Sequence, residues 1–212
     1  MSTIGFYKSL NNMGERECIE KFLVYNASLV ISEAKPSATI TLKKGKDSIY
    51  DKWIKYGKDF LGNINIKHID LRECDNALII LIYDEEQLKK YIFREENKAF
   101  LMKLGYDEEE KIDSYMEKLK ERYNEFKCPH ELGVFLGFPI DDVKDFMECT
   151  KKKCLACGYW MVYNNYNTAK KIFNTYDRIK EHTMEHILKG SSSHKVVYNL
   201  KNVINEFEYV AI

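Results

Sequence analysis

Residues 64–83 read INIKHIDLRECDNALIILIY. Over residues 64–71 apolar and polar side chains alternate, and residues 77–83 are continuously apolar. Both patterns are typical of β-strands when turn-forming residues bound them. With residues 73–76 as the turn, this stretch predicts an antiparallel hairpin at the centre of the fold.

Apolar residues at helical spacing surround this hairpin on both sides in the sequence. The acidic residues 84–86 suit a helix start, and Gly105 and Gly190 suit helix ends. The predicted helices cover residues 15–32, 48–60, 84–105, 107–126 and 168–189, and two further strands cover residues 38–42 and 157–163. This order predicts an α+β fold, a single domain in which a small, mostly antiparallel sheet packs against several helices.

The chain has 212 residues, enough for one sizeable core, and no linker rich in Gly, Pro or Ser interrupts residues 1–190. Residues 191–193 are all Ser, so we expect residues 191–212 to be an appended C-terminal element after a hinge. We expect residues 1–190 to fold without it. Apolar residues recur at helical spacing in this element. The alternative is therefore that the element forms a helix that docks on the domain or on a second chain.

Lys and Arg total 33 and Asp and Glu total 33, so the chain lacks the net positive charge typical of nucleic-acid binding. The longest apolar run is far shorter than the roughly 20 residues of a membrane span, and residues 1–12 lack a secretory leader pattern. We therefore expect a cytoplasmic protein with no membrane association. In that compartment we expect all six cysteines to be thiols.

A second stretch, residues 128–143, reads CPHELGVFLGFPIDDV. Pro129 suits the first turn of a short helix, Gly137 suits a left-handed helix end, and Pro139 opens the next helix. The stretch predicts two short helices that meet at a tight corner.

This stretch and the later CGYWMVY at residues 157–163 resemble an uncharacterised family of proteins common in anaerobic Gram-positive bacteria. Those proteins share a Pro-His-Glu-hydrophobic-Gly-x-Phe-Leu-Gly-aromatic-Pro-x-x-Asp-Val block and a Cys-Gly-Tyr-Trp-x-Val-Tyr strand. Weaker similarity extends from about Phe22 through Tyr176. Cys128, Cys149 and Cys154 lie outside the shared pattern. The resemblance implies no known activity.

His130 and Glu131 stand at the start of the first short helix, where unpaired amide groups attract anions and an imidazole changes charge near neutral pH. We predict that a small anionic ligand or a protein partner binds at the helix corner of residues 128–142 and the strand of residues 157–163, with the side chains of His130 and Glu131 at least partly exposed at the rim of a concavity. The alternative is that Glu131 only complements the helix dipole and His130 bonds to the strand behind it. The predicted binding residues are His130, Glu131, Gly133, Gly137, Asp142, Tyr159 and Trp160.

Cys154 and Cys157 have the spacing of a metal-binding knuckle, and His182 and His186 share one helix face. With Cys149 nearby, these residues predict an alternative function, a Cys/His metal site or a thiol redox centre. In the contrasting interpretation Cys157 is a small buried residue and both histidines face water.

A reactive thiol is a related alternative. Three lysines, at positions 151–153, lie between Cys149 and Cys154, and the N-terminus of a predicted helix adjoins Cys128. Both a nearby positive charge and a helix N-terminus lower the pKa of a thiol. The contrasting interpretation is a solvated lysine loop beside unreactive thiols.

Three further classes lack support in the sequence. A helix-turn-helix would expose Asp141, Asp142, Lys144, Asp145 and Glu148 to DNA, and four acids would repel phosphates. Neither a Gly-rich phosphate loop nor a Gly-x-Ser-x-Gly elbow occurs. Catalysis, cofactors and the identity of the ligand are left open.

Overall fold

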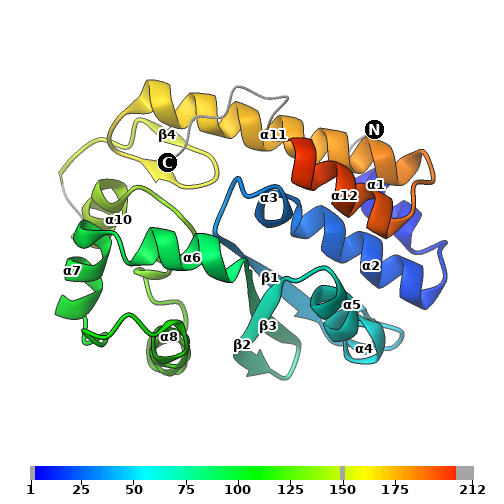
Figure 1. The fold of residues 1–212 in the computed structure, drawn as a ribbon, viewed down its shortest axis with the longest axis horizontal. Helices are drawn as coiled ribbons and strands as arrows, with labels where there is room; N and C mark the ends of the chain where they lie inside the picture. Colours follow the sequence, from blue (N-terminus) through cyan, green and yellow to red (C-terminus); the bar gives the residue numbers. More distant parts are fainter. Residues whose placement is uncertain (1–2, 149–150, 204–212) are drawn as a thin grey trace.

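The structure, a computed structural model, describes residues 3–148 and 151–203. It confirms an α+β fold with a small antiparallel three-stranded sheet of order β1-β3-β2 (Figure 1). The strands are β1 (Ser37–Lys43), β2 (Lys67–Cys74) and β3 (Ala77–Tyr83), so the predicted hairpin forms and β3 is the central strand.

The strand β2 begins later than the alternation at residue 64 predicts. Asn65 has a left-handed backbone with φ of 60°, a conformation that Asn tolerates and a strand does not use. Ile64 and Ile66 are nevertheless buried, so their alternation reflects packing of a connecting segment. Within β2 the register shifts between Asp70 and Arg72, which inserts Leu71 as a bulge.

Successive residues of β3 pack on opposite sides of the sheet, because side chains alternate along a strand. Leu78, Ile80 and Ile82 belong to one hydrophobic core, whereas Leu81 and Tyr83 belong to a second. The central strand is therefore covered by helices on both faces, which explains its uninterrupted apolar sequence.

The first core is built by helices from both ends of the chain. The predicted helix over residues 15–32 divides at Ala27, and the one over 48–60 contains a π-helical turn, η1. These elements are α1 (Thr3–Leu10), α2 (Glu15–Asn26), α3 (Ser28–Ile31), α4 (Ile49–Lys52), η1 (Trp53–Gly57), α5 (Lys58–Asn63), α11 (Tyr166–Leu188) and α12 (Ser193–Val203).

The second core is built by the middle of the chain. The helix predicted over residues 84–105 breaks at Arg94, whose backbone is extended, and the Asn97 side-chain amide donates to the carbonyl of Tyr91 at 2.8 Å. The elements are α6 (Glu85–Ile92), α7 (Glu95–Lys103), α8 (Ile112–Phe126), α9 (Leu132–Phe135) and α10 (Ile140–Met147).

The strand predicted over residues 157–163 is instead a tight hairpin of β4 (Ala156–Cys157) and β5 (Met161–Val162). The chain reverses at Gly158, whose N–H donates to the carbonyl of Trp160 at 3.1 Å. A Cβ at Gly158 would lie 2.4 Å from the Phe173 ring, so this turn packs directly on α11.

After Gly190, α12 runs along α11 and also contacts α2 and α3 (Figure 1). Its Val196, Val197 and Leu200 are buried in the first core. The described part of the C-terminal element is therefore docked on the domain, and the boundary at residue 190 stays a prediction.

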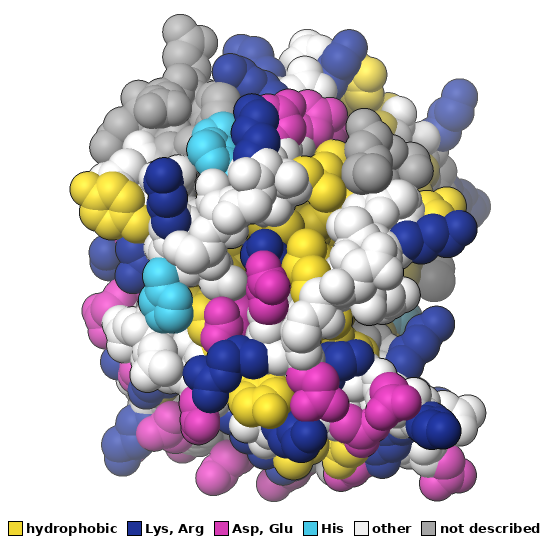
Figure 2. Space-filling view, turned by 90° about the vertical axis from the view of Figure 1, so that its right-hand side faces the viewer, with side chains coloured by type: hydrophobic (Ala, Val, Ile, Leu, Met, Phe, Trp, Pro, Cys, Tyr) yellow, Lys and Arg dark blue, Asp and Glu magenta, His cyan; other side chains and the backbone are white. Residues whose placement is uncertain are grey.

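Charged side chains of both signs are intermixed on the face shown in Figure 2. Hydrophobic side chains appear there in small groups between them. Over residues 3–148 and 151–203, no helix combines the length and apolar character needed to cross a membrane.

Candidate functional site

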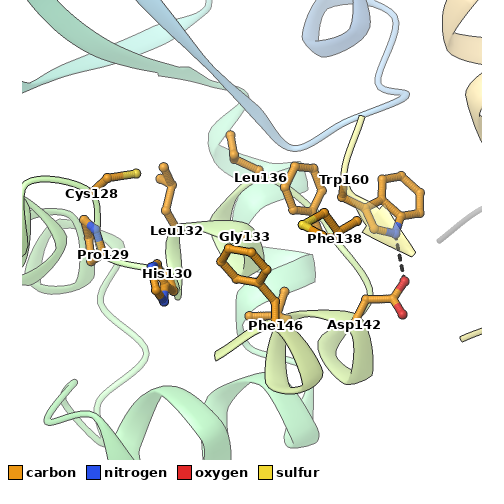
Figure 3. A pocket seen from close by; sticks show the side chains of 12 residues that line it. Cys128, Pro129, His130, Leu132, Gly133, Leu136, Phe138, Asp142, Phe146 and Trp160 are labelled. Carbon is orange, nitrogen blue, oxygen red and sulfur yellow. Dashed lines mark hydrogen bonds between the residues drawn. The ribbon is translucent and has the colours of Figure 1, made fainter. Parts of the chain in front are cut away.

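A cavity of about 420 Å³ lies between the predicted corner and the β4–β5 hairpin (Figure 3). The segment between α8 and α9 forms one end, α9 and α10 form the walls, and the hairpin closes the other end. Its lining is almost entirely apolar or aromatic and comprises Cys128, Pro129, His130, Leu132, Gly133, Leu136, Phe138, Asp142, Val143, Phe146, Trp160 and Met161.

One end of the cavity carries an imidazole and a thiol. His130 is exposed, and its ring meets the Phe146 ring edge-on with 4.9 Å between centroids. Cys128 is also exposed, and the Tyr123 hydroxyl donates to its Sγ at 3.8 Å. His130 therefore occupies the rim position that the sequence predicts for it.

The other end is aromatic. The rings of Phe138 and Trp160 stack with centroids 5.5 Å apart and planes inclined by 29°. Phe173 of α11 supports the indole from its edge at 4.5 Å. Figure 3 shows these two rings opposite the end formed by Cys128 and His130, so the aromatic surface and the imidazole lie at opposite ends of the cavity.

Asp142 fixes the hairpin against α10. Its Oδ2 accepts a hydrogen bond from Nε1 of Trp160 at 2.8 Å. Its Oδ1 accepts from the backbone N–H of Tyr163 at 2.9 Å, the backbone N–H of Asn164 at 2.8 Å and Nδ2 of Asn164 at 3.0 Å. Both oxygens are used within the protein, so Asp142 lines the cavity as a positioning residue for Trp160.

The expectation that Glu131 lies exposed at the rim is wrong, because its side chain is only 1% exposed. The carboxylate forms an ion pair with Nε of Arg122 and accepts from the Tyr106 hydroxyl at 3.4 Å. Burial and then the Glu131 charge raise the pKa of Tyr106, and the bond to Glu131 raises that of Arg122. Glu131 therefore joins α8 to α9 behind the cavity.

The two glycines of the corner have different roles. Gly137 has φ of 75°, which confirms the predicted left-handed helix end, and a Cβ there would lie 2.6 Å from Cδ of Pro36. Gly133 lines the cavity, and a Cβ there would lie 2.9 Å from Cγ2 of Val143. Close packing of α9 on its neighbours requires glycine at both positions.

Tyr159 does not line the cavity and packs on α11. Its hydroxyl donates to Oδ1 of Asp177 at 2.9 Å, and its ring meets Tyr176 edge-on at 4.9 Å. Burial and the bond to Asp177 raise the pKa of Tyr159. Of the seven predicted binding residues, the cavity lining therefore brings together His130, Gly133, Asp142 and Trp160.

The predicted metal ligands do not converge. His182 and His186 are neighbours on α11 with ring centroids 4.4 Å apart, but Cys154 and Cys157 belong to the hairpin segment. Among the described residues no three His, Cys, Asp or Glu side chains are grouped to hold a metal ion. Cys157 is exposed, so the interpretation of it as a small buried residue is also wrong.

The five described cysteines, at positions 18, 74, 128, 154 and 157, are free thiols. Cys149 lies outside the described residues, and so its predicted roles stay predictions. The Sγ of Cys154 donates to the carbonyl of Ala156 at 3.1 Å.

The predicted exposed face of α10 is partly wrong. Asp142 and Asp145 are buried, and Asp145 accepts from Nζ of Lys152 at 2.7 Å and Nδ2 of Asn164 at 2.8 Å. This face of α10 therefore holds residues on both sides of the β4–β5 hairpin, Lys152 before it and Asn164 after it.

Sequence reasoning missed most of the apolar lining. Phe146 follows Asp142 by one helical turn and therefore shares its face of α10. Met161 follows Trp160 directly in the hairpin. Phe146 could have been found from the sequence, because it is a large apolar residue on the same helix face as Asp142. Met161 could not, because no local sequence pattern indicates the hairpin that brings it to the cavity.

Comparison with known proteins places the chain in a family. Residues 23–197 match the model of a family described as a protein of unknown function, DUF3793. No curated protein matches the chain, and no solved structure matches it. The match covers most of the 212 residues and confirms the expectation of an uncharacterised family. The chain belongs to the DUF3793 family.

Proposed function

We propose that this protein binds a small ligand whose apolar body fills the cavity and whose anionic group lies at the His130 end. The observation that carries the proposal is an apolar cavity of about 420 Å³ with an imidazole at its rim. Small-molecule sites are concave, mostly apolar and of about 300–1,000 Å³, with few polar groups that orient the ligand.

An apolar body is favoured by the aromatic end of the cavity. The stacked rings of Phe138 and Trp160 offer a flat surface on which an aromatic or aliphatic group loses contact with water. Gly133 keeps the adjacent wall free of a side chain. Burial of apolar surface contributes roughly 25 cal/mol per Å² to binding, before the costs of association are subtracted.

An anionic group is favoured at the opposite end. An imidazolium at His130 would donate a charge-assisted hydrogen bond to an anion, whereas a neutral imidazole would offer no charge to it. Among the lining residues Asp142 alone is acidic, and it lies at the aromatic end with both oxygens already bonded. Glu131 is buried against Arg122. Neither carboxylate opposes an anion at His130.

Two fluorescent probes separate these parts of the proposal. 8-Anilinonaphthalene-1-sulfonate has an apolar body and a sulfonate, and N-phenyl-1-naphthylamine has the same body without the charge. We expect both to bind the folded protein with enhanced emission. We expect the sulfonate to bind more weakly as the pH rises from 5.5 to 8, whereas the neutral probe keeps its affinity.

Substitutions at two histidines provide a matched control. His130→Ala removes the rim imidazole, whereas His194→Ala removes an exposed histidine that contacts Phe60 edge-on in the same way. We expect only His130→Ala to weaken the sulfonate and abolish its pH dependence. Equal effects of both variants would contradict the anionic part of the proposal.

A second matched pair tests the cavity. Met161 lines it and is 36% exposed, whereas Met102 is 39% exposed and does not line it. We expect Met161→Trp to fill the cavity and weaken both probes, and Met102→Trp to leave them unchanged. Unchanged binding in both variants would place the probes elsewhere and overturn the proposed site.

A protein partner that inserts an apolar side chain is the second candidate for this cavity. Phe146 and Met161 are large apolar side chains that are both exposed and part of the lining, which is typical of a docking surface. Binding of the neutral probe together with no preference for the sulfonate at any pH would favour this second function.

A further inference from the structure

Lys35 is a buried lysine in the segment that joins α3 to β1. This segment lies between α11 and α6 (Figure 1), and its backbone is bonded to both. The Tyr176 hydroxyl donates to the carbonyl of Ala34 at 3.0 Å, and the N–H of Asp84 donates to the carbonyl of Pro36 at 3.1 Å. The position of Lys35 is therefore fixed from both sides, with 7% of the residue exposed.

Lys35 lacks the carboxylate that a buried lysine normally has. Lys21 shows the usual arrangement, because it is 3% exposed and forms an ion pair with Glu17 at 2.6 Å. Among the described residues no Asp or Glu oxygen lies within 4.0 Å of the Lys35 ammonium. Its contact is instead the face of the Phe138 ring, with Nζ 5.0 Å from the centroid.

A second lysine, Lys180 of α11, accompanies Lys35. Its Nζ lies 5.0 Å from the centroid of the Tyr25 ring. Burial and the charge of Lys180 lower the pKa of Lys35 to about 7. Burial likewise lowers the pKa of Lys180, although Asp177 opposes this shift.

The acids nearby are already bonded to other groups. Asp177 accepts from the Tyr159 hydroxyl, and Glu33, on the same segment as Lys35, accepts from Nε2 of Gln87 at 3.0 Å. Lys35 is thus a buried cation to which no carboxylate of the described residues is bonded, and half-buried Lys180 lies near enough for its charge to act on Lys35. Charges taken out of water need a partner of opposite sign.

We infer that Lys35 and Lys180 form a binding site for a small oxyanion, which supplies the negative charge that no carboxylate of the described chain brings to Lys35. The small exposed fraction of Lys35 restricts the ligand to a compact group, a tetrahedral oxyanion or a short carboxylate. An ammonium binds such groups as a point charge with three donors.

This site is independent of the proposed function. Lys35 does not line the cavity, although its ammonium lies over the ring of Phe138, which does. Loss of oxyanion binding leaves the apolar cavity intact, and loss of probe binding leaves the lysines in place. The two proposals therefore fail separately.

Calorimetric titration with sulfate and with acetate at pH 8 tests the inference. Bound oxyanion favours the charged lysine, so binding takes up protons, which two buffers of different ionisation enthalpy reveal. Sulfate does not itself titrate at this pH, so the protons are bound by the protein. Preference for sulfate or acetate identifies a tetrahedral or a carboxylate ligand.

Three variants localise the effect. We expect Lys35→Met and Lys180→Met each to weaken binding at least about tenfold, the loss of one charge-assisted bond. Lys170→Met removes an exposed lysine of the same helix and is expected to change nothing. Binding without proton uptake, or equal binding by Lys35→Met and the native chain, overturns the inference.

Competitive labelling with acetic anhydride gives a second readout that does not depend on a variant. We expect Lys35 to react at pH 7 to 8 ahead of exposed lysines when sulfate is absent, and saturating sulfate to protect it. If Lys35 is acetylated equally fast with and without saturating sulfate, it is a neutral structural lysine that binds no oxyanion, and the inference is overturned.

Discussion

The indole Nε1–H of Trp160 donates to Oδ2 of Asp142 at 2.8 Å, while Oδ1 of the same carboxylate accepts three bonds from Tyr163 and Asn164. One buried carboxylate therefore joins α10 to the β4–β5 hairpin and orients the indole that closes the cavity. The roles of the two oxygens can be tested separately, because only Oδ2 is bonded to the indole.

Asp142→Asn is expected to break the bond to Trp160 and keep the other three. The amide oxygen stays with the three donors, which places the amide N–H₂ against the indole N–H. Two opposed donors are expected to cost about 1–3 kcal/mol in the free energy of unfolding. In a Trp160→Phe background the opposing donor is gone, so the cost of Asp142→Asn should fall. Equal costs in both backgrounds, measured by urea denaturation, would contradict this assignment.

His130 and Glu131 are adjacent in sequence but are expected to respond differently to substitution. His130→Ala alters an exposed side chain and should change stability by no more than about 1 kcal/mol. Glu131→Gln removes the partner of Arg122 inside the protein. It should cost about 2 kcal/mol or more, less than the ~3–5 kcal/mol of a fully buried pair because Arg122 keeps some solvent contact. Similar unfolding midpoints for the two variants would contradict a structural role for Glu131.

Gly137 and Gly190 both have positive φ, 75° and 80°, and differ in what surrounds them. A Cβ at Gly137 would meet Pro36, whereas a Cβ at Gly190 would have no neighbouring atom of the described residues within 4 Å. Gly190→Ala should therefore cost about 1–2 kcal/mol from backbone strain alone. Gly137→Ala should cost clearly more, because the clash with Pro36 adds to the strain. Equal thermal stabilities of the two variants would show that the contact with Pro36 relaxes freely.

The sequence predicted those features that local patterns determine. The apolar run of β3, the hairpin with β2 and the left-handed Gly137 follow from side-chain period and turn chemistry. The break at Arg94 was missed because residues on both sides carry helical spacing, and the bond from Asn97 to Tyr91 connects different helices. Local propensity does not encode such tertiary bonds.

The candidate site was predicted only in part, because the sequence pattern does not show which distant residues contact each other. His130 and Trp160 were assigned from two separate stretches, and the structure brings both to one cavity. Glu131 was misplaced because an acid at a helix start suits either solvent or a buried partner, and its partner Arg122 comes from α8. Lys35 carried no signal, because a lysine before a proline gives no indication of burial.

Stability is expected to depend on pH through Lys35. Its pKa is lowered to about 7 in the folded protein and is close to 10.4 when unfolded, so between these values the unfolded chain binds more protons. Stability at low anion concentration should therefore rise with pH from about 7 to 10 through this group. The difference in unfolding free energy between the native chain and Lys35→Met isolates it, because other titrating groups are common to both. A difference that stays constant over this range would contradict the shift.

Truncation after Gly190 is expected to destabilise the domain, now that α12 is seen to pack on α11, α2 and α3. The truncation removes the side chains of Val196, Val197 and Leu200 from the first core. Each buried side chain of this kind contributes roughly 1.5–3 kcal/mol, so the loss should total at least about 4 kcal/mol. At about 2–4 °C per kcal/mol for this size, Tm should fall by about 10 °C or more.

Two point variants separate the loss of packing from the loss of chain length. Leu200→Asp places a charge in the first core, where burial without a partner is costly, whereas Tyr198→Asp changes a side chain that is 71% exposed. We expect Leu200→Asp to reproduce most of the effect of truncation and Tyr198→Asp to leave Tm within about 2 °C, as a surface change should. If the truncated chain and Leu200→Asp both melt at the native temperature, residues 191–212 are an appendage whose docking contributes no stability, and residues 1–190 form the complete folding unit.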